Sequence, residues 1–320
     1  MRKYIARRLL LMIPVLIGIS IVIFALINLA PGDPYTSMID PNISADDKRV
    51  MLEAIGYYDS LPVKYLKWVG RAVRGDLGYS IRYKEPVIHV ISRNLGNTLL
   101  LSISALILSV VLAVPLGVIS ATRKNTFFDN LITVFSFIGL SIPVFFFGML
   151  MIKFLAFDLN LFPISGMASI GQEMTPLQAL IDLLHHMVLP VTVLGMVNMA
   201  QLMRYTRSSM LEVIMQDYVR TARAKGLKER VVIYKHALKN ALIPVITVVC
   251  ISIGYLLSGA LLTETVFSWP GMGTLVYQSI LNRDYPLVTA STLVISLFIL
   301  LSNLLADIFY AVIDPRIKFD

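Results

Sequence analysis

Apolar residues along this chain gather in long runs rather than in the short periodic stretches that form one face of a water-soluble helix or strand. Crossing about 30 Å of hydrocarbon at about 1.5 Å per residue takes about 20 helical residues. The runs that reach this length are residues 9–30, 97–121, 131–157, 183–203, 241–263 and 287–313. The pattern predicts an all-α integral membrane protein with about six transmembrane helices.

The first run has an alternative interpretation. Basic residues precede it, as they precede the apolar part of a cleaved signal peptide. The run is longer than that part usually is, and no A-x-A cleavage site follows. We therefore interpret it as an uncleaved first helix. The fourth run is the most polar of the six, because it includes His185, His186, Asn198 and Gln201.

Prolines interrupt most of the predicted spans. A membrane helix tolerates proline when its neighbours satisfy the freed carbonyl groups, and the proline usually bends the helix. We expect such kinks at Pro14, Pro115, Pro143, Pro190 and Pro244.

Composition supports a chain that is largely surrounded by lipid. Hydrophobic residues make up 57% of it and charged residues 15%, whereas a soluble domain has about a quarter charged residues. The net charge of +8 suits either nucleic acid or an anionic membrane surface, and the apolar runs favour the membrane. Cys250 is the single cysteine of the sequence, so no disulfide forms within the chain.

Basic residues also predict the orientation, because short cytoplasmic loops are rich in Lys and Arg. Four precede the first run, and residues 204–239 contain nine against three acids. Residues 158–182 contain none, and residues 264–286 contain Arg283 alone. Both termini are therefore expected in the cytoplasm.

The runs and loops divide the chain into four parts. Residues 1–30 form a cytoplasmic N-terminus and the first helix, and residues 31–96 an extracytoplasmic domain that opens with a turn at 31–34. Residues 97–313 form a five-helix core with the cytoplasmic loop 204–239, and residues 314–320 a cytoplasmic tail.

The loop between the fourth and fifth spans contains a short predicted helix. Asp217 is placed to cap it, residues 218–225 suit about two turns, and Gly226 is placed to end it in the left-handed conformation. A second helix then leads into the fifth span. A short capped helix between two spans suits docking of a soluble partner, although an ordinary solvated basic loop also fits the pattern.

This loop resembles the EAA motif of binding-protein-dependent ABC importer permeases. Ala222, Gly226 and the Leu-Ile-Pro ending at Pro244 match the motif, whereas Arg220 and Thr221 replace its Glu and Ala. The run Tyr-Val-Arg-Thr-Ala-Arg-Ala-Lys-Gly-Leu is similar to the variant in the dipeptide and oligopeptide subfamily. The role of the motif's acid does not carry over to Arg220.

Two other stretches resemble the same subfamily. They are residues 8–34, with their Ala-Pro-Gly-Asp-Pro end, and residues 264–273, Glu-Thr-Val-Phe-Ser-Trp-Pro-Gly-Met-Gly, followed by Arg-Asp-Tyr-Pro at 283–286. The resemblance thus covers nearly the whole chain, with motifs in the expected order.

The resemblance implies the type I importer architecture in the cytoplasmic (inner) membrane of a prokaryote, with dipeptides or oligopeptides as cargo. The implied partners are a second homologous permease, two ATP-binding subunits that use ATP and Mg²⁺, an extracytoplasmic substrate-binding protein and membrane lipid, but no nucleic acid. The residues that would couple to the ATPase are Asp217, Tyr218, Arg220, Thr221, Ala222, Arg223, Ala224 and Gly226.

Alternatives remain for the cargo and for the class of transporter. Relatives of this subfamily carry nickel, glutathione or oligosaccharides, and a self-sufficient secondary transporter or channel is a further possibility. The sequence contains no G-x-x-x-x-G-K-[ST] phosphate loop, so we expect the chain not to be an ATPase. An intramembrane enzyme is a weaker alternative, because the sequence shows no convergent set of acid, base and nucleophile. We expect it to bind no cofactor directly.

Candidate pathway or gate residues are polar or compliant groups in the fourth span and in the loop at 269–273. Interhelical packing is the alternative for those in the span, and an interfacial anchor is the alternative for the loop. They are Asn198, Met199, Gln201, Trp269 and Met272. Asp182 and His185 share a helix face that suits a metal ion, but interfacial packing is favoured there, and no metal or catalytic site is predicted.

Overall fold

The computed structural model describes residues 2–29, 46, 49–50, 53, 56–171, 173–259 and 261–313. Helices dominate these residues, and the one β-type pairing among them is an isolated antiparallel bridge between Tyr79 and Pro86. The predicted all-α fold is confirmed. The expected turn at residues 31–34 and the tail 314–320 lie outside the described residues.

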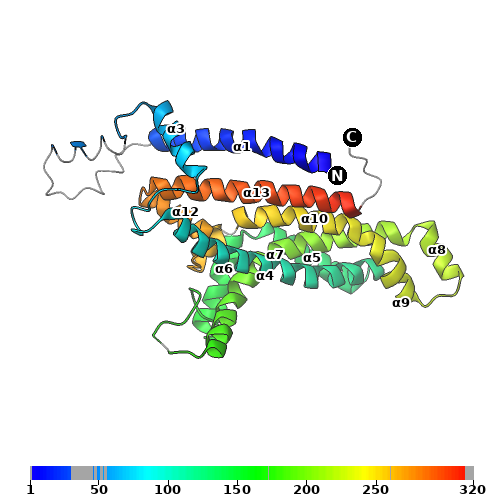
Figure 1. Ribbon diagram of the computed structural model, residues 1–320. Coiled ribbons are helices and arrows are strands. Elements are labelled where there is room, and N and C mark those ends of the chain that lie inside the picture. Colours follow the sequence, from blue (N-terminus) through cyan, green and yellow to red (C-terminus); the bar gives the residue numbers. More distant parts are fainter. Residues whose placement is uncertain are drawn as a thin grey trace.

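Five helices are long and apolar enough to cross a membrane, and they run side by side (Figure 1). Most of their outward side chains are apolar, as lipid contact requires. Several extend beyond the predicted spans. The five are α1 (Arg2–Leu29), α4 (Val87–Thr122), α7 (Pro176–Ile214), α10 (Leu238–Gly259), which continues from Glu229, and α13 (Tyr285–Ile313).

The third predicted span, residues 131–157, breaks at Pro143, where a kink is expected, and it counts as a sixth span only if its two helices are taken together. The chain forms α5 (Phe127–Ser141), then α6 (Val144–Met151) with the π-helical turn η1 (Ile152–Asp158), bent by 104° from α5. Pro143 explains the break, since it disfavours the helical conformation of the residue before it. Ile142 is accordingly extended, with φ −81° and ψ 126°.

Small residues let the central helices approach closely, as is common in membrane bundles. A Cβ added at Gly117 of α4 would lie 2.6 Å from the Thr206 Cβ of α7. Ser109 Oγ of α4 donates to the Gly195 carbonyl of α7 at 2.8 Å. Helix α1 is peripheral and packs along α13, where Arg8 and Asp307 form a 3.0 Å ion pair.

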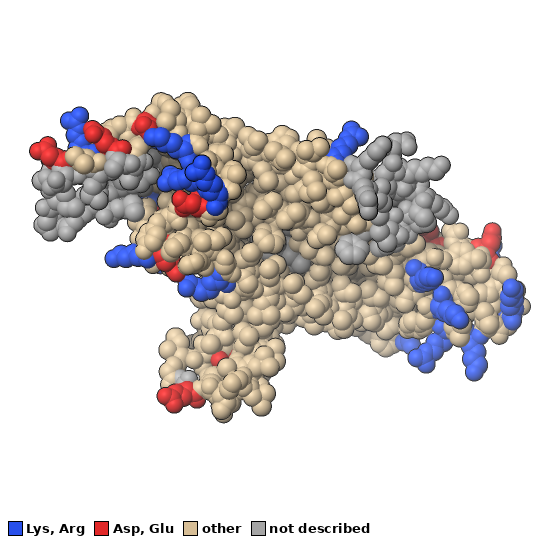
Figure 2. Space-filling view, viewed as in Figure 1, with Lys and Arg blue, Asp and Glu red and all other residues tan. Residues whose placement is uncertain are grey.

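The two ends of the bundle differ in what they carry. Helices α8 (Asp217–Ala224) and α9 (Glu229–Val231) project from one end, where α1 begins and α13 ends, whereas α3 (Leu61–Ala72) and α12 (Met272–Leu281) lie near the other (Figure 1). Lys and Arg side chains lie over both ends in Figure 2, but at the end with α3 they are mixed with Asp and Glu, whereas at the end with α8 they predominate. This arrangement agrees with the expected clustering of basic segments, and the cytoplasmic location of that end stays a prediction.

Candidate functional site

Helix α8 is closed by a left-handed glycine, as predicted. Gly226 has φ +75°, and its amide donates to the Arg223 carbonyl at 2.9 Å. The start differs from the prediction. Gln216 is the extended residue before the helix, and Asp217 is the first helical residue, with its side chain 97% exposed beside Arg220. The prediction that Asp217 caps the helix is therefore wrong.

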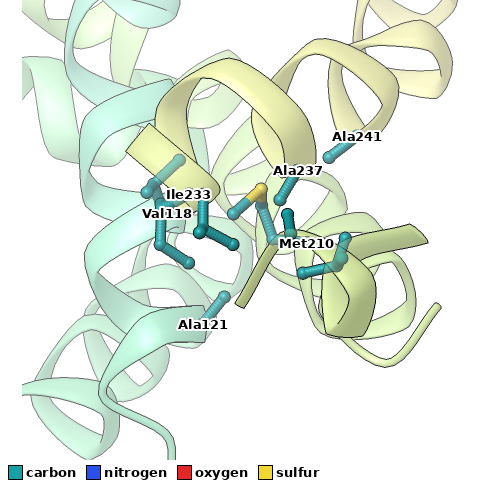
Figure 3. Packing of buried hydrophobic residues seen from close by; sticks show 9 residues of the cluster. Val118, Ala121, Met210, Ile233, Ala237 and Ala241 are labelled. Carbon is teal, nitrogen blue, oxygen red and sulfur yellow. The ribbon is translucent and has the colours of Figure 1, made fainter. Parts of the chain in front are cut away.

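The inner face of α8, Val219 and Ala222, is buried in an apolar cluster that joins several helices (Figure 3). Val118 and Ala121 come from the last turns of α4, and Met210 comes from α7. The remaining members lie on the chain that leads from α8 into α10: Val232, Ile233, Ala237 and Ala241. Movement of α8 would thus be transmitted through this shared cluster to α4, α7 and α10.

The outer face of α8 consists of Asp217, Arg220, Thr221 and Ala224, which follow the i, i+3, i+4, i+7 spacing of one helix side. All four side chains are exposed. They point away from the buried pair Val219 and Ala222, which lies on the opposite side. The helix therefore presents a continuous free surface.

Two polar contacts hold the flanks of α8. Asn240 Nδ2 donates to Tyr218 Oη at 2.9 Å, and the Arg223 guanidinium donates to both carboxylate oxygens of Glu229, at 2.7 and 3.1 Å. These bonds to Glu229 raise the pKa of Arg223 above its usual value. The helix is held on three sides and open on the fourth.

An ion pair between a buried acid and a half-buried arginine, which sequence reasoning missed, lies near this cluster. Asp129, at the start of α5, accepts from Arg207 Nε at 2.7 Å and Nη2 at 2.9 Å. It also accepts from Ser120 Oγ of α4 and from the Asn125 amide. The pair joins α4, α5 and α7. The sequence offered one indication of this site, because Asp129 follows Thr126, which caps the start of α5. Nothing in the sequence indicated that Arg207 is its partner.

The opposite end contains a buried polar clasp built around Glu264 of α11 (Leu261–Val266), whose side chain is fully buried. Its carboxylate accepts from Thr98 Oγ1 at 2.6 Å and from the amides of Gly273 and Thr274 at 2.8 and 3.1 Å. Thr98 Oγ1 in turn accepts from the Met272 amide at 2.7 Å. The clasp fixes the start of α12 to α4.

The clasp also explains the glycines of the Trp-Pro-Gly-Met-Gly stretch. A Cβ added at Gly273 would lie 2.6 Å from the Leu261 Cα and 2.9 Å from a Glu264 carboxylate oxygen. A Cβ added at Gly271 would overlap the same carboxylate. The glycines are thus required because Glu264 reaches the backbone beside them.

Trp269 and Met272 are both completely buried by the chain itself. Trp269 Nε1 donates to the Asn97 carbonyl at 3.0 Å, and its ring packs against Leu101 and Leu194. In this structure Trp269 is therefore neither exposed at the outer surface nor positioned as a lipid-facing anchor. A gating role for these two residues stays a prediction.

The candidate residues of α7 lie in a different part of the bundle. Asn198, Met199 and Gln201 are half-buried, and Met199 packs in a cluster with Leu202 and Val245 that does not include Trp269. Asn198 bonds to its own helix, at 3.4 Å from the Leu194 carbonyl. The structure does not bring the predicted pathway residues together into one site.

A further buried acid that sequence reasoning missed is Asp284, which directly precedes α13. Its side chain, fully buried, accepts from Ser80 Oγ and, at 3.1 Å, from the Arg82 amide. These bonds tie the segment before α4 to the start of α13. The Arg-Asp-Tyr-Pro motif therefore anchors the chain around residues 78–86.

The pair considered for a metal ion, Asp182 and His185, is occupied by bonds to the neighbouring loop. Asp182 accepts from Ser169 Oγ at 2.7 Å, and His185 Nε2 lies 2.9 Å from the Leu161 carbonyl. No group of three or more possible metal ligands occurs in the described part of the chain. Interfacial packing is thus the role that the contacts of these two residues support.

Comparisons with known proteins agree with the resemblance seen in the sequence. Residues 113–319 match the family described as "Binding-protein-dependent transport system inner membrane component", and residues 1–102 match its N-terminal counterpart. The chain is 46% identical over 320 residues to the oligopeptide transport system permease protein AppB of Bacillus subtilis, covering 100% of both chains. It is 38% identical over 336 residues to the dipeptide transport system permease protein DppB of Escherichia coli K12, covering 99% of both.

A solved structure supports the fold. The MetNI methionine ABC transporter in an inward-facing conformation includes a chain that matches 71% of this one over 97% of its own length, with a TM-score of 0.56 and 17% identity. Together with the membrane-spanning helices, the sequence matches identify this chain as a member of the family of binding-protein-dependent transport system inner membrane components.

Proposed function

We propose that this chain is a permease subunit of an ATP-driven importer that carries dipeptides or oligopeptides across the cell membrane. Its family and its full-length similarity to permeases named for oligopeptides and dipeptides support this cargo. An extracytoplasmic binding protein delivers the peptide, and two permease chains form the pore. The pore alternates between outward-open and inward-open states.

The outer face of α8 is the observation that carries this proposal. Its four side chains are exposed on one side of a helix whose other side is packed into the ends of α4, α7 and α10. A soluble ATPase subunit docked on that face would push or pull the bundle through the inner face. In this role α8 is a coupling helix at the cytoplasmic end.

The energy comes from partner subunits. The sequence has no phosphate-binding loop, so two ATP-binding subunits bind ATP and Mg²⁺ in its place. Closure of that pair on ATP would move both coupling helices. The Asp129–Arg207 pair, which joins α4, α5 and α7, supports movement of these helices as one rigid body.

Reconstitution of the complete transporter tests the proposal. The tagged chain is purified in mild detergent with its ATPase subunits and second permease, then placed in liposomes with the binding protein and a labelled dipeptide. We expect uptake that needs both ATP and the binding protein. Unlabelled di- and tripeptides with ordinary α-peptide bonds should compete, whereas Ni²⁺, the γ-linked tripeptide glutathione and oligosaccharide should not.

Two results would contradict parts of the proposal. Uptake by the purified chain alone, without ATPase subunits, would make it a self-sufficient transporter. The binding protein could instead stimulate ATP hydrolysis without any accumulation of peptide. That result would agree with an ATP-driven importer but contradict peptides as its cargo.

A further inference from the structure

Helix α3 packs against the side of a membrane-crossing helix. Its Tyr65 Oη lies 2.7 Å from Ser20 Oγ of α1, and the Phe24 ring of α1 meets the Tyr65 and Trp68 rings at centroid distances of 5.4 and 6.1 Å. Ser20 and Phe24 both lie inside the apolar span of α1. Because α1 is peripheral in the bundle, a helix that contacts these two residues lies at the membrane.

The helix is placed on the membrane surface rather than through it. It lies across α1 instead of along it (Figure 1). It has 12 residues, which span about 18 Å and cannot cross about 30 Å of hydrocarbon. None of its residues is buried within the chain. Helix α3 is therefore a surface helix beside lipid and not a further span.

Three faces run along α3 and its first following turn. Tyr65 and Trp68 belong to the face that packs on α1. An apolar face has the i, i+4, i+7, i+11 spacing of one helix side, and a basic face has the i, i+3, i+7, i+10 spacing of another. The apolar face consists of Pro62, Leu66, Val69 and Val73, and the basic face of Lys64, Lys67, Arg71 and Arg74.

The apolar face is open although it has no partner among the described residues of α1. The side chains of Leu66 and Val73 are 67% and 81% exposed. Val73 follows the last residue of α3 but keeps helical angles, with φ −63° and ψ −26°, so it continues the same side. The aromatic pair Tyr65 and Trp68 is of the kind that sits at headgroup level in membrane proteins.

The basic face has more positive charge than its own surroundings neutralise. Residues 61–74 contain four basic residues and no acid. Lys67 Nζ pairs with Asp59 at 2.6 Å, whereas Lys64 Nζ lies over the Tyr57 ring, 5.0 Å from its centroid. No acid of the described part of the chain pairs with Arg71. Lys and Arg side chains lie over the position of α3 in Figure 2.

We propose that α3 lies in the membrane interface and binds the headgroups of anionic phospholipids. Its apolar face enters the edge of the hydrocarbon, and Lys64, Arg71 and Arg74 contact the phosphate groups. A short helix with a basic side, an apolar side and aromatic residues between them is the type that lies in the plane of a bilayer. The charge of the exposed basic residues complements anionic lipid. The predicted extracytoplasmic domain is thus attached to the membrane surface at α3.

Spin labels in the complete transporter, reconstituted in liposomes, test the position of the helix. A label is attached to Leu66→Cys in a Cys250→Ala background, with partner subunits free of cysteine, and to Lys67→Cys as the control on the basic face. We expect the label at position 66 to collide with O₂, which dissolves in lipid, and the label at 67 to collide with a water-soluble nickel complex.

Either of two other results at position 66 would overturn the proposal. Access of the nickel complex would show that the apolar face lies in water. Access of neither reagent would show that another protein covers this face.

Brominated lipids test the choice of headgroup. Bilayers contain equal amounts of phosphatidylglycerol and phosphatidylcholine, with only one of the two brominated, and the difference between the wild-type chain and Trp68→Phe isolates the fluorescence of Trp68. We expect brominated phosphatidylglycerol to quench Trp68 about fivefold more than brominated phosphatidylcholine, the ratio that one basic residue beside an anionic surface gives. Equal quenching by the two lipids would overturn the headgroup site.

Charge removal assigns the preference to the basic face. The double variant Lys64→Gln, Arg71→Gln should lose the preference for phosphatidylglycerol while Trp68 stays quenched by both lipids. The matched variant Arg82→Gln, Arg93→Gln removes the same charge from the segment after α3 and from the start of α4, and should keep the preference. An unchanged preference in the first variant, or its loss in both, would overturn the role of Lys64 and Arg71.

Discussion

The clasp around Glu264 and helix α8 lie near opposite ends of the bundle and are built in opposite ways. The clasp buries its polar atoms completely and bonds them within the chain. Helix α8 buries two small apolar side chains and leaves a row of polar and small ones exposed. The clasp is therefore a joint completed within the chain, whereas α8 presents a surface that is free for another protein.

Removing the carboxylate at the centre of the clasp should have the largest effect on stability. In Glu264→Ala, Thr98 and the amides of Gly273 and Thr274 lose their acceptor in a buried place, which should lower the free energy of unfolding by about 3 kcal/mol or more. Thermal unfolding in detergent measures the change. Thr265→Ala, at the exposed neighbouring position, serves as control, and equal melting of the two variants would show that the clasp is not a joint.

The ion pair behind α8 should come next. Asp129→Ala leaves Arg207 without its carboxylate, and because the Arg207 side chain is 29% exposed, water relieves part of the loss. We expect a cost of about 2 kcal/mol. A double-mutant cycle with Arg207→Ala measures the coupling of the two residues. Strictly additive single effects would contradict the pairing.

A glycine substitution at the end of α8 should have a smaller effect. In Gly226→Ala the added Cβ has no other atom within 4 Å, but the alanine must adopt φ +75°. This strain should lower the free energy of unfolding by about 1 kcal/mol. Gly70→Ala in α3, also without close neighbours, provides the control and should be neutral or slightly stabilising. Faster hydrogen exchange of the α8 amides in the first variant alone would support the difference.

The outer face of α8 should contribute least to stability. Arg220→Ala removes only a 3.6 Å ion pair with Asp217 between two well-exposed side chains. The free energy of unfolding should change by no more than about 0.5 kcal/mol, which thermal unfolding in detergent measures as a small shift in melting temperature. A large loss of stability would mean that the outer face is held by this chain and is not free for a partner.

The sequence could predict the structural elements that depend on residues close together in the chain. Apolar run length located five spans, and Gly226 marked the end of α8. The sequence predicted a kink at Pro143 but not its size, because hydropathy over residues 131–157 stays high on both sides of Pro143 and run length alone cannot show a change of direction.

The burial of the acids and the identity of their hydrogen-bond partners could not be predicted from the sequence. Glu264 and its partner Thr98 are 166 residues apart, and Asp129 and Arg207 are 78 apart. Nothing near either acid in sequence indicates which distant donor it meets. The glycines beside Trp269 suggested a turn, whereas their steric reason, the approach of Glu264, required the three-dimensional structure.

The measurement that tests the coupling role most directly is ATP hydrolysis by the assembled transporter carrying Ala224→Arg. This substitution adds a long charged side chain to the exposed outer face, while Ser92→Arg adds the same side chain to an exposed position of α4 near the other end. We predict that Ala224→Arg loses its ATPase subunits and its peptide-stimulated hydrolysis, while the second permease stays bound and the Ser92→Arg transporter remains fully active. Normal stimulated hydrolysis by the Ala224→Arg transporter would contradict the docking of an ATPase subunit on α8.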